Sequence, residues 1–140
     1  MDDGCIFCAI LEGTAPSEPL IETDLAFAFM NANPAALGHA LVIPKRHATD
    51  IWDLSPEDGG AVWTLTQRVA HAARDAFAPD GLNLFQANRR AGWQSVFHFH
   101  IHVVPRWAGD PVVPPWTEPK GDRQDIPDAA ARLRGALTAR

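Results

Sequence analysis

The sequence predicts one α+β domain in which an antiparallel meander sheet carries a long helix on one face. Short apolar segments separated by turn residues occupy residues 20–43, and a long amphipathic segment follows at 56–77. Alternating apolar segments return at 82–104. With 140 residues, 46% of them hydrophobic and 21% charged, the chain is large enough to bury its own core.

The first half of the predicted sheet consists of three strands. They are Leu20-Ile21, Leu25 to Met30, and His39 to Ile43. Turn chemistry at residues 31–34 and at Leu37-Gly38 separates them. Pro44 closes the third strand because proline has no N–H to donate to a ladder.

A long helix follows these strands. Ser55 is its expected N-cap, Pro56 its first residue, and Asp58 the acid at the third position. Apolar residues then recur at helical spacing, at Val62, Leu65, Val69, Ala72 and Ala76. The helix is expected to end near Phe77, before the turn at Pro79-Asp80-Gly81.

Two more strands complete the predicted sheet. Leu82 to Gln86 and Val96 to Val104 have strand character, and Ala87 to Trp93 is the loop between them. After Pro105 the periodicity disappears, and six of the twelve prolines lie between Pro105 and Pro127. We therefore expect residues 1–107 to form the domain.

Residues 108–140 are expected to form a proline-rich extension. Its prolines favour an extended segment crossing a surface, either of this chain or of a partner subunit. A short helix from about Asp128 to Ala139 ends the chain.

Composition narrows the class of protein. The net charge of −5 disfavours binding of duplex nucleic acid but allows a small anionic ligand. No segment is long and apolar enough to cross a bilayer, and the acidic N-terminus lacks the features of a signal peptide. A cytoplasmic location is expected. In that reducing compartment the two cysteines are thiols or metal ligands rather than a disulfide.

The most informative feature is the run His98-Phe99-His100-Ile101-His102-Val103-Val104. Half of the chain's six histidines lie within five consecutive positions, 98–102. In a strand, successive side chains point to opposite faces, so the three imidazoles would share one face. Imidazole is the side chain best suited to nucleophilic attack and proton transfer near neutral pH.

Three interpretations of this run compete. The histidines could lie on a solvated sheet face, could hold a catalytic metal, or could form a nucleophilic and acid–base cluster. A metal shared by His100 and a neighbour is feasible. One ion bound by all three is difficult, because positions 98 and 102 lie roughly 13 Å apart along a strand and metal–nitrogen bonds are about 2 Å.

This run resembles the signature of the histidine-triad (HIT) superfamily of nucleotide hydrolases and transferases. Phe29-Met30-Asn31 followed by residues 38–47 is similar to the family's N-terminal strand pair, and Gly92 to Val96 to its phosphate-side loop. The similarity extends from about Cys5 to Trp107. His102 stands where the uridylyltransferase branch has Gln, so the chain resembles the Hint-like and Fhit-like hydrolases instead.

The resemblance implies a HIT-like fold and assigns catalytic roles. His100 would attack the α-phosphorus of a nucleotide and form a covalent nucleotidyl-histidine that water hydrolyses. His102 and Ser95 would serve the phosphate and the leaving group. Gln94 and nearby loop amides would stabilise the developing charge. His39 would complete the cluster, although it can also be read as a core histidine.

Substrate recognition is implied by three further positions. Asn31 would bind the ribose, at a position where Hint-like members have an acid and Fhit-like members have Asn. Asn88, with Gln94, Ser95 and the two histidines, would contact the sugar–phosphate. Trp93, between Gly92 and Gln94, reshapes the leaving-group pocket. The implied substrates are nucleoside phosphoramidates or dinucleoside polyphosphates, with purines preferred, and the implied assembly is a homodimer.

The pair Cys5-Ile6-Phe7-Cys8 is expected to bind metal. A thioredoxin-like redox pair would follow a strand, and none precedes this one. The resemblance supplies His47 and His98 as the remaining zinc ligands. A Cys₂His₂ set closes the zinc tetrahedron, which is typical of a structural site, so no metal is expected in the chemical step.

Two alternatives from other classes remain open. One is a metalloenzyme with a catalytic ion at His100 and His102. The other is a nucleotide-binding regulatory module with little turnover.

Overall fold

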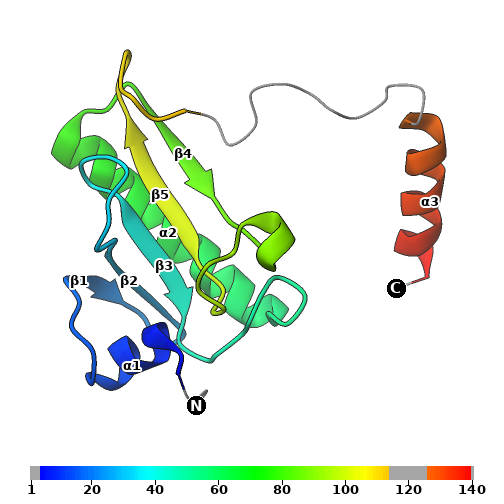
Figure 1. Cartoon of the computed structure of the whole chain (residues 1–140), viewed down its shortest axis with the longest axis horizontal. Helices are drawn as coiled ribbons and strands as arrows, with labels where there is room; N and C mark the ends of the chain where they lie inside the picture. The colour runs from blue at the N-terminus through cyan, green and yellow to red at the C-terminus, as the bar shows by residue number, and fades with distance from the viewer. Residues whose placement is uncertain (1–3, 114–125, 140) are drawn as a thin grey trace.

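Five strands form one antiparallel sheet in the order β1-β2-β3-β5-β4, and helix α2 lies across one face of it (Figure 1). The computed structural model describes residues 4–113 and 126–139. The predicted α+β class, with an antiparallel sheet and one long helix, is confirmed. In chain order the elements are α1 (Ile6–Glu12), β1 (Pro19–Glu22), β2 (Ala26–Met30), β3 (Ala40–Pro44), α2 (Pro56–Phe77), β4 (Gly81–Phe85), the 3₁₀ turn η1 (Arg90–Gly92), β5 (Ile101–Arg106) and α3 (Ile126–Thr138).

The strand order departs from a simple meander at one point. β1, β2 and β3 are consecutive neighbours, as predicted. Helix α2 then carries the chain past the sheet, so that β4 forms the outer edge and β5 returns between β3 and β4. The 22 residues of α2 span roughly 33 Å, which is long enough to cross the whole face before the chain re-enters the sheet.

Helix α2 begins and ends where the sequence predicts. The Ser55 hydroxyl accepts the N–H of Asp58 at 3.1 Å, and Pro56 is the first helical residue. After Phe77 the chain turns through Ala78, which has a left-handed backbone with φ 46°. The apolar stripe of the helix packs on small residues of the sheet, which let the two layers approach closely; the buried contacts include Val62, Leu65, Val69, Ala26, Ala28 and Ala40.

The other face of the sheet is covered in part by α1, which the sequence analysis did not predict. Cys5 is its N-cap, and the Cys5 sulfur accepts the N–H of Cys8 at 3.3 Å. Gly13 ends the helix with φ 81°, a conformation that costs glycine little. α1 buries Phe7 against three residues of the sheet, Phe29, Leu41 and Ile43.

The histidine run is a strand only in its second half. β5 begins at Ile101, so the prediction of a strand from Val96 is wrong for residues 96–100. Those residues bend to reach the segment after β3, where Phe99 N–H donates to the Ala48 carbonyl. Alternation nevertheless persists through the bend. Phe99, Ile101 and Val103 face the α2 side, whereas the rings of His98 and His100 pack on Phe7 at the opposite face.

The chain after β5 is anchored near the sheet before it leaves the domain. The Arg106 guanidinium donates to both carboxylate oxygens of Asp110, at 2.8 and 2.7 Å, and to Asn83 of β4 at 2.7 Å. α3 covers most of the predicted terminal helix, and none of its residues is buried. The predicted proline-rich crossing segment lies mostly in 114–125, outside the described residues. Within the described ranges, no helix is long and apolar enough to span a membrane.

Gly38, directly before His39, is expected to be less tolerant of a side chain than Gly13. Both have φ near +80°, so alanine at either position should cost about 1–2 kcal/mol. At Gly38 the added Cβ would also lie 2.6 Å from the Phe77 ring and 3.3 Å from Pro105, whereas Gly13 faces open space. Urea unfolding should therefore show a larger loss of stability for Gly38→Ala than for Gly13→Ala. Equal losses would contradict this packing.

Candidate functional site

Three histidines meet on one face of the sheet and form what we call the histidine cluster: His39 directly before β3, His100 directly before β5, and His102 within β5. In the β3–β5 register Leu41 lies opposite His102, so His39 is a diagonal neighbour of His102 on the same face. The ring centroids of His39 and His102 lie 5.1 Å apart, and those of His100 and His102 lie 4.9 Å apart. Two of the predicted triad histidines and the predicted fourth histidine are thus brought together.

Hydrogen bonds determine which nitrogen of His102 carries the proton. The Ala35 N–H donates to His39 Nδ1 at 2.9 Å, so a neutral His39 has its proton on Nε2. That Nε2–H donates to His102 Nδ1 at 2.9 Å. His102 therefore holds its own proton on Nε2. Asn31 Nδ2 lies 3.2 Å from His39 Nε2. Both nitrogens carry protons in this tautomer, so this is a contact and not a hydrogen bond, and it places the predicted ribose-binding residue beside the cluster.

His100 has the opposite tautomer. Its Nδ1–H donates to the backbone carbonyl of His98 at 2.8 Å. Because a neutral imidazole has a single N–H, the Nε2 lone pair of His100 is available. Only 5% of the His100 surface is exposed. This is the arrangement that a nucleophilic imidazole requires.

Burial keeps these rings neutral. Desolvation lowers the pKa of His39 and of His100, although the bond to the His98 carbonyl partly opposes the shift of His100. The pKa of His102 falls to about 4, mainly through burial and then through the neighbouring His100 and His39. At pH 7 the cluster therefore consists of neutral imidazoles in which each proton has a defined position.

The third triad histidine, His98, belongs to a second group, which we call the Cys–His cluster: Cys5, Cys8, His47 and His98. One ligand atom from each lies within 4.8 Å of all the others. His98 Nδ1 is 3.4 Å from Cys5 Sγ and 3.6 Å from Cys8 Sγ, and His47 Nδ1 is 3.3 Å from Cys8 Sγ. Sulfur and nitrogen ligands of tetrahedral zinc are about 3.6 Å apart, given the usual bond lengths. The donor set fits zinc.

His98 is oriented for metal binding by its other nitrogen. Its Nε2–H donates to the Pro44 carbonyl at 2.9 Å, so Nδ1 carries no proton and its lone pair faces the sulfurs. The ring is completely buried. Burial also lowers the pKa of His98 to about 4, so the ring is in the neutral form that ligation needs.

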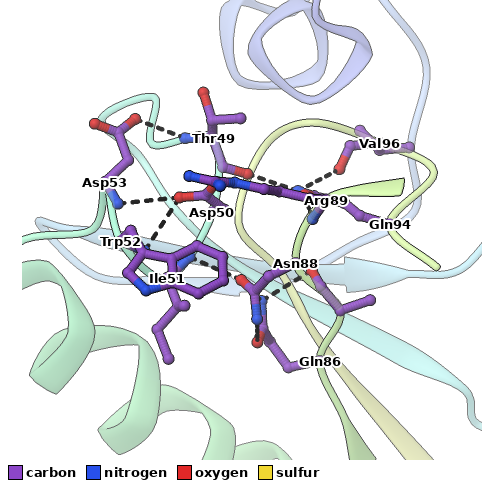
Figure 2. Close-up of polar contacts among 11 residues, drawn as sticks. Thr49, Asp50, Ile51, Trp52, Asp53, Gln86, Asn88, Arg89, Gln94 and Val96 are labelled. Atoms are coloured by element: carbon purple, nitrogen blue, oxygen red, sulfur yellow. Dashed lines mark hydrogen bonds and ion pairs between the residues drawn. The ribbon is translucent and has the colours of Figure 1, made fainter. Parts of the chain in front are cut away.

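Asn88 and Gln94 lie in a network that joins residues 49–53 to the loop before the histidines, which we call the loop brace (Figure 2). Asn88 Oδ1 accepts the Ile51 N–H at 2.8 Å, and Asn88 Nδ2 donates to Gln86 at 2.6 Å. Buried Asp50 accepts the N–H groups of Trp52 and Asp53, each at 3.1 Å.

Gln94 is the centre of this brace. Its Oε1 accepts the Arg89 N–H at 2.6 Å, and its Nε2 donates to the carbonyls of Thr49 at 2.6 Å and Val96 at 3.1 Å. Both N–H donors of its amide group are therefore used inside the protein in this conformation, and its oxygen accepts one backbone N–H. Gln94 shapes the loop.

The loop carries backbone strain at two bulky residues. Arg89 has φ 64° and Trp93 has φ 71°, both in the region that favours glycine. The Arg89 side chain is held by buried Asp50 at 3.3 Å and lies 4.5 Å above the Trp52 ring (Figure 2). These contacts help to offset the strain. Ser95, the predicted leaving-group residue, is exposed beside Gln94.

Sequence reasoning missed Asp50, Phe7 and the Pro44 carbonyl. Asp50 had a usable signal, because an Asp at the start of a turn commonly accepts the following N–H groups. The roles of Phe7 and of the Pro44 carbonyl depend on contacts between distant segments. No local pattern indicates such contacts.

Comparison with known proteins agrees with this geometry. The HIT domain family model matches residues 12–109. An adenosine 5′-monophosphoramidase of Schizosaccharomyces pombe, hnt1, is 40% identical over 102 residues, which cover 73% of this chain and 74% of that protein. The crystal structure of a HIT family protein from Bacillus anthracis superposes with a TM-score of 0.87 at 31% identity, covering 97% of this chain and 99% of that chain.

A zinc-bound histidine triad family protein from Mycobacterium smegmatis is also similar. It has a TM-score of 0.75 and 36% identity, and the match covers 95% of this chain and 97% of that chain. The fold and its paired histidines define a histidine-triad protein. This chain belongs to the HIT family.

Replacing Gln94 by Glu should destabilise the loop brace. Glutamate keeps an oxygen for the Arg89 N–H but loses both donors, and leaves a carboxylate against the carbonyls of Thr49 and Val96. We expect a loss of about 2 kcal/mol or more in the free energy of unfolding, measured by urea denaturation. Gln67→Glu is the control, because Gln67 is an exposed residue of α2, outside the loop brace. An unchanged free energy of unfolding in Gln94→Glu would contradict the bracing role.

Proposed function

We propose that the protein hydrolyses the α-phosphate linkage of a nucleotide through a covalent nucleotidyl-His100 intermediate. The observation that supports this most directly is the buried His100 ring, whose Nδ1–H is bonded to the His98 carbonyl and whose Nε2 is free to attack. Membership of the HIT family and the 40% identity to an adenosine 5′-monophosphoramidase support a nucleotide substrate.

The reaction proceeds in two displacements. His100 Nε2 attacks the α-phosphorus, an N–P bond forms, and the bond to the leaving group breaks as that group takes up a proton. Water then attacks the same phosphorus and gives up a proton, which balances the one taken up by the leaving group. The N–P bond breaks, and a nucleoside monophosphate leaves with the neutral imidazole restored. Dividing one displacement into two lowers the barrier of each.

The neighbouring residues support the phosphate. His102 presents Nε2–H as a donor to a phosphoryl oxygen, and His39 maintains that tautomer. Ser95, exposed beside the strained loop, supplies a hydroxyl for the leaving group. The loop held by Gln94 and Asn88 supplies backbone amides, and Asn31 lies where it can contact the ribose.

We propose a purine nucleoside phosphoramidate as the substrate class, with dinucleoside polyphosphates as the second class to test. The named activity of the yeast relative favours the first. A catalytic ion at His100 and His102 is less well supported, because His102 accepts at Nδ1 and carries its proton on Nε2, which leaves it no lone pair for an ion.

We also propose that zinc binds the Cys–His cluster. The four donors approach tetrahedral spacing, and a similar structure is zinc-bound. Zinc would join α1 to the segments carrying His47 and His98 and would take no part in the chemical step. Neither Cys5 nor Cys8 is in a disulfide bond, which fits a reducing compartment such as the cytoplasm.

A homodimer is proposed through α2 and the edge strand β4. Trp63 of α2 is 50% exposed and Leu84 of β4 is 40% exposed, and β4 pairs with β5 on one side only. Light scattering should give twice the 15.3 kDa chain mass. Leu84→Lys should shift the protein toward the monomer, whereas Leu20→Lys on the opposite edge strand should not. A monomeric wild type would refute the dimer.

The nucleophile is tested by trapping the intermediate. Acid quenching of a reaction with adenosine 5′-phosphoramidate should yield protein carrying one adenylyl group. His100→Ala should abolish that adduct and lower kcat by at least about 10³-fold, because no other imidazole nitrogen takes its position. His71→Ala, an exposed histidine of α2, is the control and should behave as wild type. Adduct formation by His100→Ala would refute the assignment.

The zinc site is tested by Cys8→Ala. The change removes a buried sulfur from the ligand set, so bound zinc measured by mass spectrometry should fall well below one ion per chain. The melting temperature should fall as well. His71→Ala should retain its zinc. Full occupancy in Cys8→Ala would show that the Cys–His cluster is not the site.

A further inference from the structure

Phe7 connects the two clusters. It lies between Cys5, the N-cap of α1, and Cys8, and it is 6% exposed. Its ring meets the His100 ring nearly at a right angle, with centroids 5.2 Å apart and an interplanar angle of 89°. The same ring contacts His98 at 5.8 Å. A side chain within the Cys-x-x-Cys segment therefore touches both the proposed nucleophile and a member of the Cys–His cluster.

His100 needs this second contact because one hydrogen bond does not fix its ring. The bond from Nδ1 to the His98 carbonyl holds a single atom. The last torsion of a histidine is broad and has two preferred states, and rotation between them would exchange the positions of nitrogen and carbon atoms. The perpendicular Phe7 ring restricts that rotation. The two contacts together keep Nε2 directed toward a substrate.

Phe7 in turn depends on the residues beside it. α1 has only seven residues, and helices shorter than about 12–15 residues are marginal on their own. It is held to the sheet through buried Phe7 and Cys8 and through the sulfurs, which lie near the nitrogens of His47 and His98. Fixing both cysteines fixes the phenyl ring between them.

We propose that Phe7 is a positioning residue for His100 and that the Cys–His cluster controls the orientation of the nucleophile. Two routes lead from that cluster to His100: the Phe7 ring and the His98 carbonyl. This proposal rests on the proposed function of His100. It assigns to the metal ligands an effect on the rate of nucleotidyl transfer in addition to the anchoring of the N-terminal segment.

The first test compares Phe7→Leu with Phe29→Leu. Both residues are buried in the same apolar group and contact each other at 5.4 Å, but the described ring contacts of Phe29 are with Phe7 and Phe27. The measurement is the single-turnover rate of adenylyl-His100 formation from adenosine 5′-phosphoramidate. Phe7→Leu should slow this step about tenfold or more, with KM changed by less than about twofold. Phe29→Leu should leave the rate within about twofold.

A second measurement reports the His100 ring directly. Nitrogen-15 NMR of the histidine side chains should show a single Nδ1–H form for His100 in the wild type and in Phe29→Leu, and a mixture of tautomers in Phe7→Leu. If Phe7→Leu does not fold, Phe7→Met replaces it, since methionine fills similar volume without a ring. Equal slowing in both variants, or an unchanged rate and tautomer in Phe7→Leu, would overturn the positioning role.

The link to the metal ligands has its own test. Wild type loaded with Zn²⁺ is compared with protein treated with a chelator, again by the His100 nitrogen signals. Removing Zn²⁺ should produce the tautomer mixture seen in Phe7→Leu, while Phe7→Leu itself keeps its zinc. Unchanged His100 signals after removal would overturn the link. If the loaded wild type forms no adduct at all, the proposed function fails, and the NMR comparison still decides whether Phe7 orients the ring.

Discussion

The hydrogen bond from His100 Nδ1 to the His98 carbonyl joins the Cys–His cluster to the histidine cluster along the backbone. The carbonyl belongs to a residue whose ring faces two thiols, and the donor belongs to the ring proposed to attack phosphorus. The position of His100 therefore depends on how residues 96–100 are held. That segment is not part of the β5 ladder, so its conformation comes from contacts with other elements. Those contacts include the Pro44 carbonyl, the Ala48 carbonyl, the Phe7 ring and the Gln94 amide.

Electrostatics in the histidine cluster is governed by burial and not by acidic partners. The hydrogen bonds that orient the rings come from backbone groups or from another imidazole. A neutral ring with one placed proton is a better nucleophile and a more selective donor than a charged one. Desolvation supplies the neutral state, and the Ala35 N–H together with the His98 carbonyl supplies the tautomers. Two adjacent histidines thereby present different groups, a lone pair on His100 and an N–H on His102.

The long helix and the strands could be predicted from local patterns. Ser55 and Pro56 predict where α2 begins, and the apolar segments bounded by turn residues predict β2 and β3. α1 could not be predicted in this way. Its N-cap is a cysteine, and its only buried residues, Phe7 and Cys8, are adjacent and show no helical spacing. The early start assigned to β5 failed for a related reason. Alternating apolar residues are compatible both with a hydrogen-bonded strand and with a bent segment whose two sides are packed, so the pattern does not distinguish them.

The sequence by itself determined which chemistry is available: imidazoles at alternating positions, a Cys-x-x-Cys pair, and amide side chains before the histidines. Tertiary structure decided how that chemistry is divided. His98, His100 and His102 are equivalent in the sequence, but partners distant in the chain give each a different proton position and a different neighbour. Gln94, expected at the phosphate, is itself buried and donates to the carbonyls of Thr49 and Val96, which come from two separate segments of the chain. These different roles arise from three-dimensional packing, because each polar group bonds to a partner that is close in space, whatever its distance along the chain.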